Sequence, residues 1–389
     1  MKEIGISVYP DFDDLETIKK TLDTAKELGY KEIFTSIELG DLGFENTTIG
    51  INDKFQFLFE YCHQLDLEIH VDINDRMLKH IGGAPDNLKP VFDLKIKVLR
   101  LDSGFTHQEI ALMTKNPYGI IIEENASMLQ FPKERIETIV SEGNIQQYYA
   151  CHNFFPLNET GLRYEDALAS AKLFKSYGIK VGIFIGSLYS SRDLNDVGDY
   201  IVTIEDHRYK PSYIQAMELF VHPEFDFIIF GDSHPRLDEL QKVSQVAQYD
   251  CLDFLSTQYD MSRLDKNDIK GLYCVEIPVW FDIDLDEDIK KRLTHMVFLP
   301  RSDQPELMVR GTQSRDICAC TRYNPLKREA YSLVMINEFA NRYNGELQIP
   351  LTDLPAVRYA NVIGQVKPYA RRLVELIQYG QALFVLKED

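Results

Sequence analysis

The sequence has no long apolar run, no excess of positive charge and no cysteine pair at metal-binding spacing. None of its segments approaches 18 consecutive apolar residues, which argues against a transmembrane helix. The N-terminus, MKEIGISVYP, lacks a charged region followed by an apolar one. Such a start is not typical of a secretory signal, so we predict a cytoplasmic protein that has no membrane partner.

The charge balance and the cysteines exclude further classes. The formal net charge is -19, and nucleic acid is bound by surplus Lys and Arg, so we expect no nucleic-acid partner. An anionic small molecule remains a possible ligand if a few cations gather locally. The six cysteines are scattered without a C-x-x-C pair, which indicates reduced structural thiols and no metal site built from cysteines.

What the sequence does contain is a repeated alternation of short β-rich runs with helically spaced apolar residues. Alternation of this kind predicts a parallel sheet covered by helices, and eight strands close a (β/α)8 barrel. A doubly wound open sheet would usually show a glycine-rich turn after its first strand, but here that strand ends in VYPDFDD. We therefore predict a TIM barrel over residues 1–248. Its eight strands are expected at residues 3–9, 32–39, 67–73, 97–103, 119–125, 147–153, 180–186 and 226–232.

The alternation stops after about residue 248. From residue 272 onward the runs CVEIPVWFDI, HMVFLPRSD, GELQIPL and ANVIGQV predict short strands broken by Pro and Gly, with almost no helix before residues 371–376. We predict a smaller, mainly β domain over residues 265–389.

Polar residues at the ends of the expected strands are the candidates for chemistry, because strand ends of a barrel converge on one mouth. The loop after the seventh expected strand adds three more. The candidates are Tyr9, Ser36, Glu38, His70, Asp72, Arg100, Asp102, Glu123, Asn125, His152, Asn153 and Asp232, with Glu205, His207 and Arg208 from the loop.

These residues are compatible with three interpretations of their function. Two carboxylates at different pKa values could act as acid and as base or nucleophile in glycoside cleavage. Acidic and histidine side chains could instead hold a divalent metal in a sugar isomerase or epimerase. Each carboxylate could also simply cap a helix or pair with an arginine, as Asp102 could with Arg100 on the same side of its strand.

Glu123 and Asp102 are the leading acid and base candidates, with Asp72 as the replacement. Glu123 follows a Gly-Ile-Ile-Ile run, and apolar neighbours around an inward-facing carboxyl raise its pKa, as a general acid requires. Only one of Glu123 and Glu124 can point inward, and the strand phase does not choose between them. Tyr9 and Ser36 are predicted to bind the substrate.

Long ordered motifs also resemble a known family. GISVYP, LRLDSGF, KNPYGIIIEENAS, CHNFFPLNETGL, EDHR, RGTQSR and GELQI are similar to the MupG-like 6-phospho-N-acetylmuramidases, from the first strand to about residue 365. The resemblance implies a TIM barrel followed by a cyclophilin-like β domain, in a cytoplasmic enzyme without metal or organic cofactor. The implied substrate is the disaccharide MurNAc-6-phosphate-GlcNAc, cleaved during cell-wall recycling.

Site residues follow from the matching motifs. The motifs contain Asp102, Glu123, Glu205 and Arg208. His152 and Asn153 would hold sugar hydroxyls or the acetamido group. Arg310 and Arg315 of VRGTQSR could contact phosphate or the lactyl carboxylate, because arginine forks match both anions. A non-catalytic carbohydrate-binding protein is the remaining alternative, since the loops PLNETGL and DVGDYIVTIEDHR depart from the family pattern.

Overall fold

A computed structural model describes residues 2–40, 47–127, 132–189, 199–303, 305–318, 323–377 and 382–388. These residues form two compact units. The larger comprises Lys2–Ala216 and Pro223–Ser244, and the smaller comprises Met217–His222 and Gln245–Asp389.

The larger unit is a closed barrel of eight parallel strands, as predicted for a TIM barrel. Each strand pairs with the next, and β1 pairs with β8 to complete the ring. Most strands stop one to three residues before the expected ends, because the chain turns there into the loops of the mouth. The strands are β1 (Glu3–Ser7), β2 (Glu32–Ser36), β3 (Glu68–Ile73), β4 (Val98–Leu101), β5 (Ile121–Asn125), β6 (Tyr148–Cys151), β7 (Lys180–Ile185) and β8 (Phe227–Phe230).

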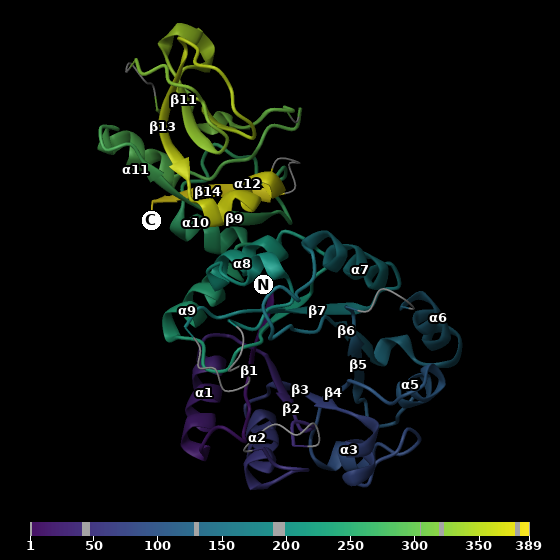
Figure 1. The fold of residues 1–389 in the computed structure, drawn as a ribbon. Helices are drawn as coiled ribbons and strands as arrows, with labels where there is room; N and C mark the ends of the chain where they lie inside the picture. Colours follow the sequence, from purple (N-terminus) through teal and green to yellow (C-terminus); the bar gives the residue numbers. More distant parts are fainter. Residues whose placement is uncertain are drawn as a thin grey trace. The chain divides into compact units, whose positions relative to one another are not determined.

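Helices lie outside the ring of strands (Figure 1). Local sequence signals begin and end them. Asp14 caps α1, Thr106 and Glu109 form a capping box on α5, and Gly29 and Gly178 adopt positive φ just after α1 and α7. None of the helices in the described part of the chain is both long and apolar enough to cross a bilayer. The helices up to residue 258 are α1 (Leu15–Glu27), α2 (Asp53–Gln64), α3 (Asp75–His80), α4 (Lys89–Asp93), α5 (His107–Met113), α6 (Pro132–Glu142), α7 (Tyr164–Ser176), α8 (Ser212–Phe220), α9 (Leu237–Val246) and α10 (Leu252–Gln258), with short 3-10 turns at Ile145–Gln147 and Glu205–His207.

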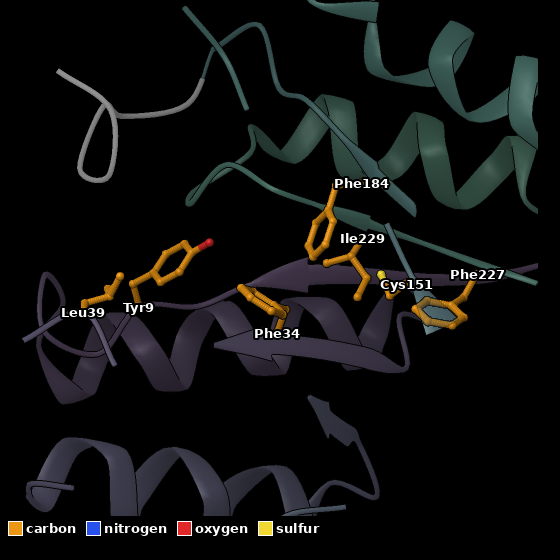
Figure 2. Packing of buried hydrophobic residues seen from close by; sticks show 7 residues of the cluster. All are labelled: Tyr9, Phe34, Leu39, Cys151, Phe184, Phe227 and Ile229. Carbon is orange, nitrogen blue, oxygen red and sulfur yellow. The ribbon is translucent and has the colours of Figure 1, made fainter. Parts of the chain in front are cut away.

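Aromatic side chains fill part of the barrel interior (Figure 2). The rings of Phe34 and Phe184 meet edge to face, with centroids 5.1 Å apart, and Phe154 packs against both. Edge-to-face pairs of this kind stabilise a core beyond the area they bury. This hydrophobic cluster includes Tyr9, one of the residues predicted to lie at the mouth of the barrel.

The smaller unit contains a six-stranded mixed sheet in the order β10-β12-β11-β13-β9-β14, in agreement with the predicted β domain. Two predictions were wrong in detail. The described residues of 295–303 form only isolated bridges, at Met296, Phe298 and Pro300, and proline cannot donate to a ladder. Helices α10 and α11 were not predicted, although Asp286 caps α11. The elements are β9 (Tyr273–Phe281), α11 (Glu287–His295), β10 (Met308–Gly311), β11 (Ser332–Ile336), β12 (Leu347–Pro350), β13 (Ala360–Val366), α12 (Arg371–Ile377) and β14 (Ala382–Glu388), with 3-10 turns η3 (Thr312–Ser314), η4 (Glu338–Tyr343) and η5 (Pro368–Ala370).

Candidate active site

Strand register sets three predicted site residues side by side. Asp72 of β3 is paired with Arg100 of β4, and Arg100 is paired with Glu123 of β5. Because residues at one level of neighbouring parallel strands point to the same side, all three side chains face the barrel interior. Arg100 contacts both carboxylates, with Nη1 donating to Oε1 of Glu123 at 3.1 Å and Nε lying 3.4 Å from Oδ1 of Asp72.

Glu123 lies below the mouth, within a buried ion network. Its side chain has no exposed surface, and Oε2 is 2.9 Å from Nδ1 of His70. Burial opposes ionisation, but His70 and Arg100 lower the pKa of Glu123. The expectation of a raised pKa was therefore wrong: the run of isoleucines places Glu123 in the core, but two cations meet it there. A carboxylate paired in this way is unsuited to donate a proton.

Glu124 takes the opposite orientation, which the strand phase alone could not decide. Its carboxylate accepts from the Tyr148 hydroxyl at 2.8 Å and pairs with Arg135 of α6 at 2.9 Å. It therefore lies between strand and helix, outside the barrel interior.

The network continues toward the amino ends of the strands. His70 Nε2 is 2.8 Å from Oε2 of Glu32, and Lys180 lies 3.2 Å from Oε1 of Glu32 and 2.6 Å from Glu3. Burial alone would lower the pKa of His70, but the charges and hydrogen bonds of Glu123 and Glu32 raise it to about 10. A charged imidazolium thus bridges two glutamates. His70 was predicted only as a strand-end residue, and Glu32 and Lys180 were not predicted, because their pairing depends on the closure of the barrel.

Three carboxylates gather at the carboxyl ends of β2, β3 and β4, and we call them the carboxylate cluster: Glu38, Asp72 and Asp102. An oxygen atom of each lies within 4.8 Å of the oxygens of the other two. Glu38 is 3% exposed, whereas Asp102 is open to solvent. Glu38 was not predicted to be catalytic, although its position two residues after Ser36 places it at the same strand end.

The cluster favours protonated carboxyls. Burial, followed by the nearby charges of Asp72 and Asp102, raises the pKa of Glu38 to about 9. Burial also raises the pKa of Asp72 to about 7, although the charge of Arg100 opposes that rise. Carboxyls this close cannot all ionise, so the cluster holds protons near neutral pH. This is the property that the prediction had assigned to Glu123.

Two groups of described residues have ligand atoms close enough together for a cation: the carboxylate cluster, and Glu32 with Glu68 and His70. In the second group both ring nitrogens of His70 already contact glutamates. In the cluster, the guanidinium of Arg100 lies beside Asp72 and would repel a metal ion. Both arrangements are better suited to proton transfer or ion pairing than to metal binding.

Several residues predicted to bind the substrate are buried. Tyr9 is 1% exposed, and its hydroxyl lies 3.2 Å from the Gly231 carbonyl oxygen, which places it in the core (Figure 2). Ser36 is 4% exposed, and its Oγ lies 3.4 Å from the backbone nitrogen of Glu38. Burial, with help from Arg100, lowers the pKa of His152 to about 3, so this ring is neutral. The geometry favours a supporting role for all three residues.

Asn153 supports Arg100 directly. Its Oδ1 accepts a hydrogen bond from Nη2 of Arg100, and its backbone nitrogen donates to Oγ of Ser127 at 2.9 Å. The half-buried Asn153 therefore lies next to the group that contacts Asp72. Asp232 accepts hydrogen bonds from the backbone nitrogens of Ser187 and Ile201. These bonds join the loop after β8 to the loop after β7.

Glu205 and Arg208 organise the loop PLNETGL. Arg208 is fully buried, and its donors reach four backbone carbonyls as well as Glu205. Glu205 accepts from the backbone nitrogens of Glu159 and Gly161 at 2.9 and 2.8 Å. The bond from Arg208 is the main reason that the pKa of Glu205 falls to about 2. These bonds fix Arg208 within the protein, and its contact with the substrate stays a prediction.

Arg310 and Arg315 belong to the smaller unit. Nε of Arg310 donates to Oε1 of the buried Glu346 at 2.6 Å, and Nε of Arg315 donates to Oε2 of the same carboxylate at 2.7 Å. The structure thus brings the two predicted arginines together around a carboxylate that sequence analysis did not identify.

A closed parallel barrel with a proton-holding carboxylate cluster at the carboxyl ends of its strands defines a (β/α)8-barrel enzyme. Comparison with protein families makes the class specific. The family model described as 6-phospho-N-acetylmuramidase, N-terminal, matches residues 4–245, and its C-terminal counterpart matches residues 275–386. The chain belongs to the 6-phospho-N-acetylmuramidase family, whose name describes a glycosidase acting on a phosphorylated muramic sugar.

Solved structures agree with the fold. The chain is similar to an uncharacterized Bacillus cereus protein at 26% identity and a TM-score of 0.81, covering 100% of this chain and 99% of that one. A conserved Enterococcus faecalis protein of unknown function gives 22% identity and a TM-score of 0.70, with coverage of 100% and 96%. A search of curated proteins found no significant match.

Proposed function

We propose that the protein hydrolyses MurNAc-6-phosphate-GlcNAc to MurNAc-6-phosphate and GlcNAc in cell-wall recycling, with the carboxylate cluster as its acid and base. The family supports a phosphorylated muramic substrate. The observation that carries the proposal is the meeting of Glu38, Asp72 and Asp102 within 4.8 Å at the ends of adjacent strands.

Asp72 is the best candidate for the general acid. A pKa of about 7 lets it hold a proton at neutral pH and still release it to a leaving oxygen. Arg100, held by Asn153 and Glu123, fixes one side of Asp72 and stabilises its ionised form. Asp72 can then act as a base when water enters.

Asp102 is the solvent-facing partner. In inverting glycosidases the two carboxyls stand roughly 6.5–9.5 Å apart to admit a water molecule, and in retaining enzymes about 5–5.5 Å apart. Oxygen atoms of the cluster lie within 4.8 Å of one another, a spacing nearer to that of the retaining enzymes. Asp102 would attack the sugar, or orient the 2-acetamido oxygen of the sugar so that this oxygen attacks.

Glu38 completes the cluster as a neutral group. With a pKa raised to about 9 it keeps its proton at pH 7, so it can donate a hydrogen bond without adding a third negative charge.

The test incubates purified protein with MurNAc-6-phosphate-GlcNAc, its unphosphorylated analogue and phosphorylated β-glucosides, with and without EDTA. We expect hydrolysis that is confined to phosphorylated compounds and insensitive to EDTA. Loss of activity on chelation would favour the metal-dependent isomerase or epimerase instead, and saturable binding without turnover would favour a carbohydrate-binding protein.

Variants test the residue assignments. Asp72→Asn and Asp102→Asn should each lower kcat by about 10²-fold or more, the usual contribution of a positioned acid or base. Asp93→Asn, which changes an exposed aspartate paired with Lys89 on α4, is the matched control and should leave kcat unchanged. Near-normal kcat in both cluster variants would exclude the proposed roles.

A further inference from the structure

The smaller unit contains a pocket of its own, with a volume of about 460 Å³. Pockets that hold small ligands usually have volumes of roughly 300–1,000 Å³ and combine apolar walls with a few polar groups. This pocket lies in that range of volume and combines aliphatic and aromatic side chains with an arginine and two amides. It is lined by Arg310, Ile336, Ala340, Asn341, Tyr343, Gln348 and Tyr359.

Paired strands form the floor of the pocket. Arg310 of β10 lies opposite Gln348 of β12, and Gln348 lies opposite Val334 of β11. Val334 and Ile336 belong to an apolar cluster against which Tyr343 packs. An arginine and an amide are thus set beside an apolar surface, and the exposed ring of Tyr359 provides a second aromatic wall.

Positive charge concentrates around Tyr343, one of the residues that line the pocket. The guanidinium groups of Arg310, Arg315 and Arg342 lie 5.7, 4.8 and 4.9 Å from the centre of the Tyr343 ring. Glu346 is the one carboxylate that contacts this group among the described residues, so three positive charges face one negative charge. In a chain with a formal net charge of -19, such an excess is a local exception.

The arginines are also held in place. Glu346 has no exposed surface and pairs with Arg310 through two bonds of 2.6 and 3.0 Å. Its pKa is lowered, despite its burial, by hydrogen bonds from Arg310, Gln348 and Arg315, so it stays ionised. Fixed guanidinium groups lose less conformational freedom when they bind an anion, which favours binding.

We infer that this pocket is a second ligand site, which binds a small sugar bearing a carboxylate or a phosphate. The arginine guanidinium groups near Tyr343 would contact the anion. The rings of Tyr343 and Tyr359 would contact the apolar face of the sugar. The inference rests on the proposed function only for its choice of acidic amino sugars as ligands. It requires no hydrolysis in the barrel.

The experiment measures hydrogen exchange of the full chain with four probes: N-acetylmuramic acid, GlcNAc-6-phosphate, GlcNAc and inorganic phosphate. Titration calorimetry gives the affinities. We expect the acidic sugars to protect residues 308–311 and 338–346, and GlcNAc to leave both segments unprotected. A stronger effect of N-acetylmuramic acid than of GlcNAc-6-phosphate would identify the carboxylate as the anion that is recognised, and the reverse would identify the phosphate.

Arg310→Gln should weaken the binding that protects these segments roughly tenfold or more, because a charge-assisted contact is lost. Arg342→Gln changes an exposed arginine that does not contact Glu346, so it reduces the charge with little risk to folding and should also weaken binding. The control is Arg371→Gln, an arginine of the same unit that stacks on Tyr331 at 5.1 Å. This variant should bind as the wild type does.

The inference is overturned if neither acidic sugar protects the two segments at millimolar concentration, or if both arginine variants bind like the wild type. The same binding experiment with the Asp72→Asn variant separates ligand binding in the pocket from hydrolysis in the barrel. If hydrolysis is never observed but protection persists in that variant, the proposed function fails and the second site stands.

Discussion

Replacement of His70 by glutamine tests whether the buried network is structural. The protonated ring lies between Glu123 and Glu32, with contacts of 2.9 and 2.8 Å, and has no exposed surface. Removing one partner of a buried ion pair usually costs 3–5 kcal/mol, because the remaining charges lose their compensation. A rise of the pKa from 6.5 to about 10 corresponds to an upper limit of about 5 kcal/mol. We therefore expect His70→Gln to lower the free energy of unfolding by about 3–5 kcal/mol at pH 7.

The pH dependence makes this prediction specific. A base whose pKa is raised on folding contributes its full stabilisation below pH 6.5, and that contribution is lost as the pH rises through about 10. The difference between wild type and His70→Gln should thus shrink between pH 7 and pH 10. Urea unfolding of the barrel measures it, and His80→Gln, at an exposed position in α3, is the control. A difference below 1 kcal/mol at pH 7, or one that does not change with pH, would refute the reasoning.

Three further changes test other parts of the site. Glu123→Gln should destabilise the barrel by about 3 kcal/mol or more, seen as a lower urea midpoint, because His70 and Arg100 lose a buried partner; an unchanged midpoint would contradict the network. The pKa of Glu38 is raised to about 9, so the stabilisation it contributes is lost as the pH rises through 9. Melting curves at pH 7 and 9.5 should therefore show a smaller pH-induced loss for Glu38→Gln than for wild type, and equal losses would argue against a buried neutral Glu38. Arg208→Lys removes the fork that holds Glu205 and should speed hydrogen exchange in residues 155–161, while exchange that remains slow would show that the loop is held otherwise.

Much of the fold follows from local pattern. The spacing of apolar runs predicted eight strands, and all eight are present in one closed barrel. The helix signals at Thr106 and Gly29 also lie where the structure has helix ends, because caps act within one turn. The departures lie in the smaller unit, where a proline interrupts an expected strand and two helices were missed.

The candidate site was predicted only in part, and the raised pKa that we expected for Glu123 is found instead at Glu38 and Asp72. Sequence places Asp72, Asp102 and Glu123 near strand ends, but it carries no information on which cations meet each one. Glu123 lies against His70 and Arg100 and is ionised. Burial is the main reason that the pKa values of Glu38 and Asp72 are raised; nearby carboxylates add to the rise, and Arg100 opposes it at Asp72. The pKa of each group thus depends on burial and on partners that are distant in sequence.

The amino-acid sequence by itself determined the alternation of strands and helices, the family and the acidic character of the chain, since these depend on composition, periodicity and motif. Only the tertiary structure decided which charges meet. Closure of the barrel joins β2, β3, β4, β5 and β7, so that Glu32, His70, Arg100, Glu123 and Lys180 form one buried network. Electrostatic interactions fall off with distance in space and not with separation along the chain, and for that reason the three-dimensional arrangement decides which carboxyls hold protons.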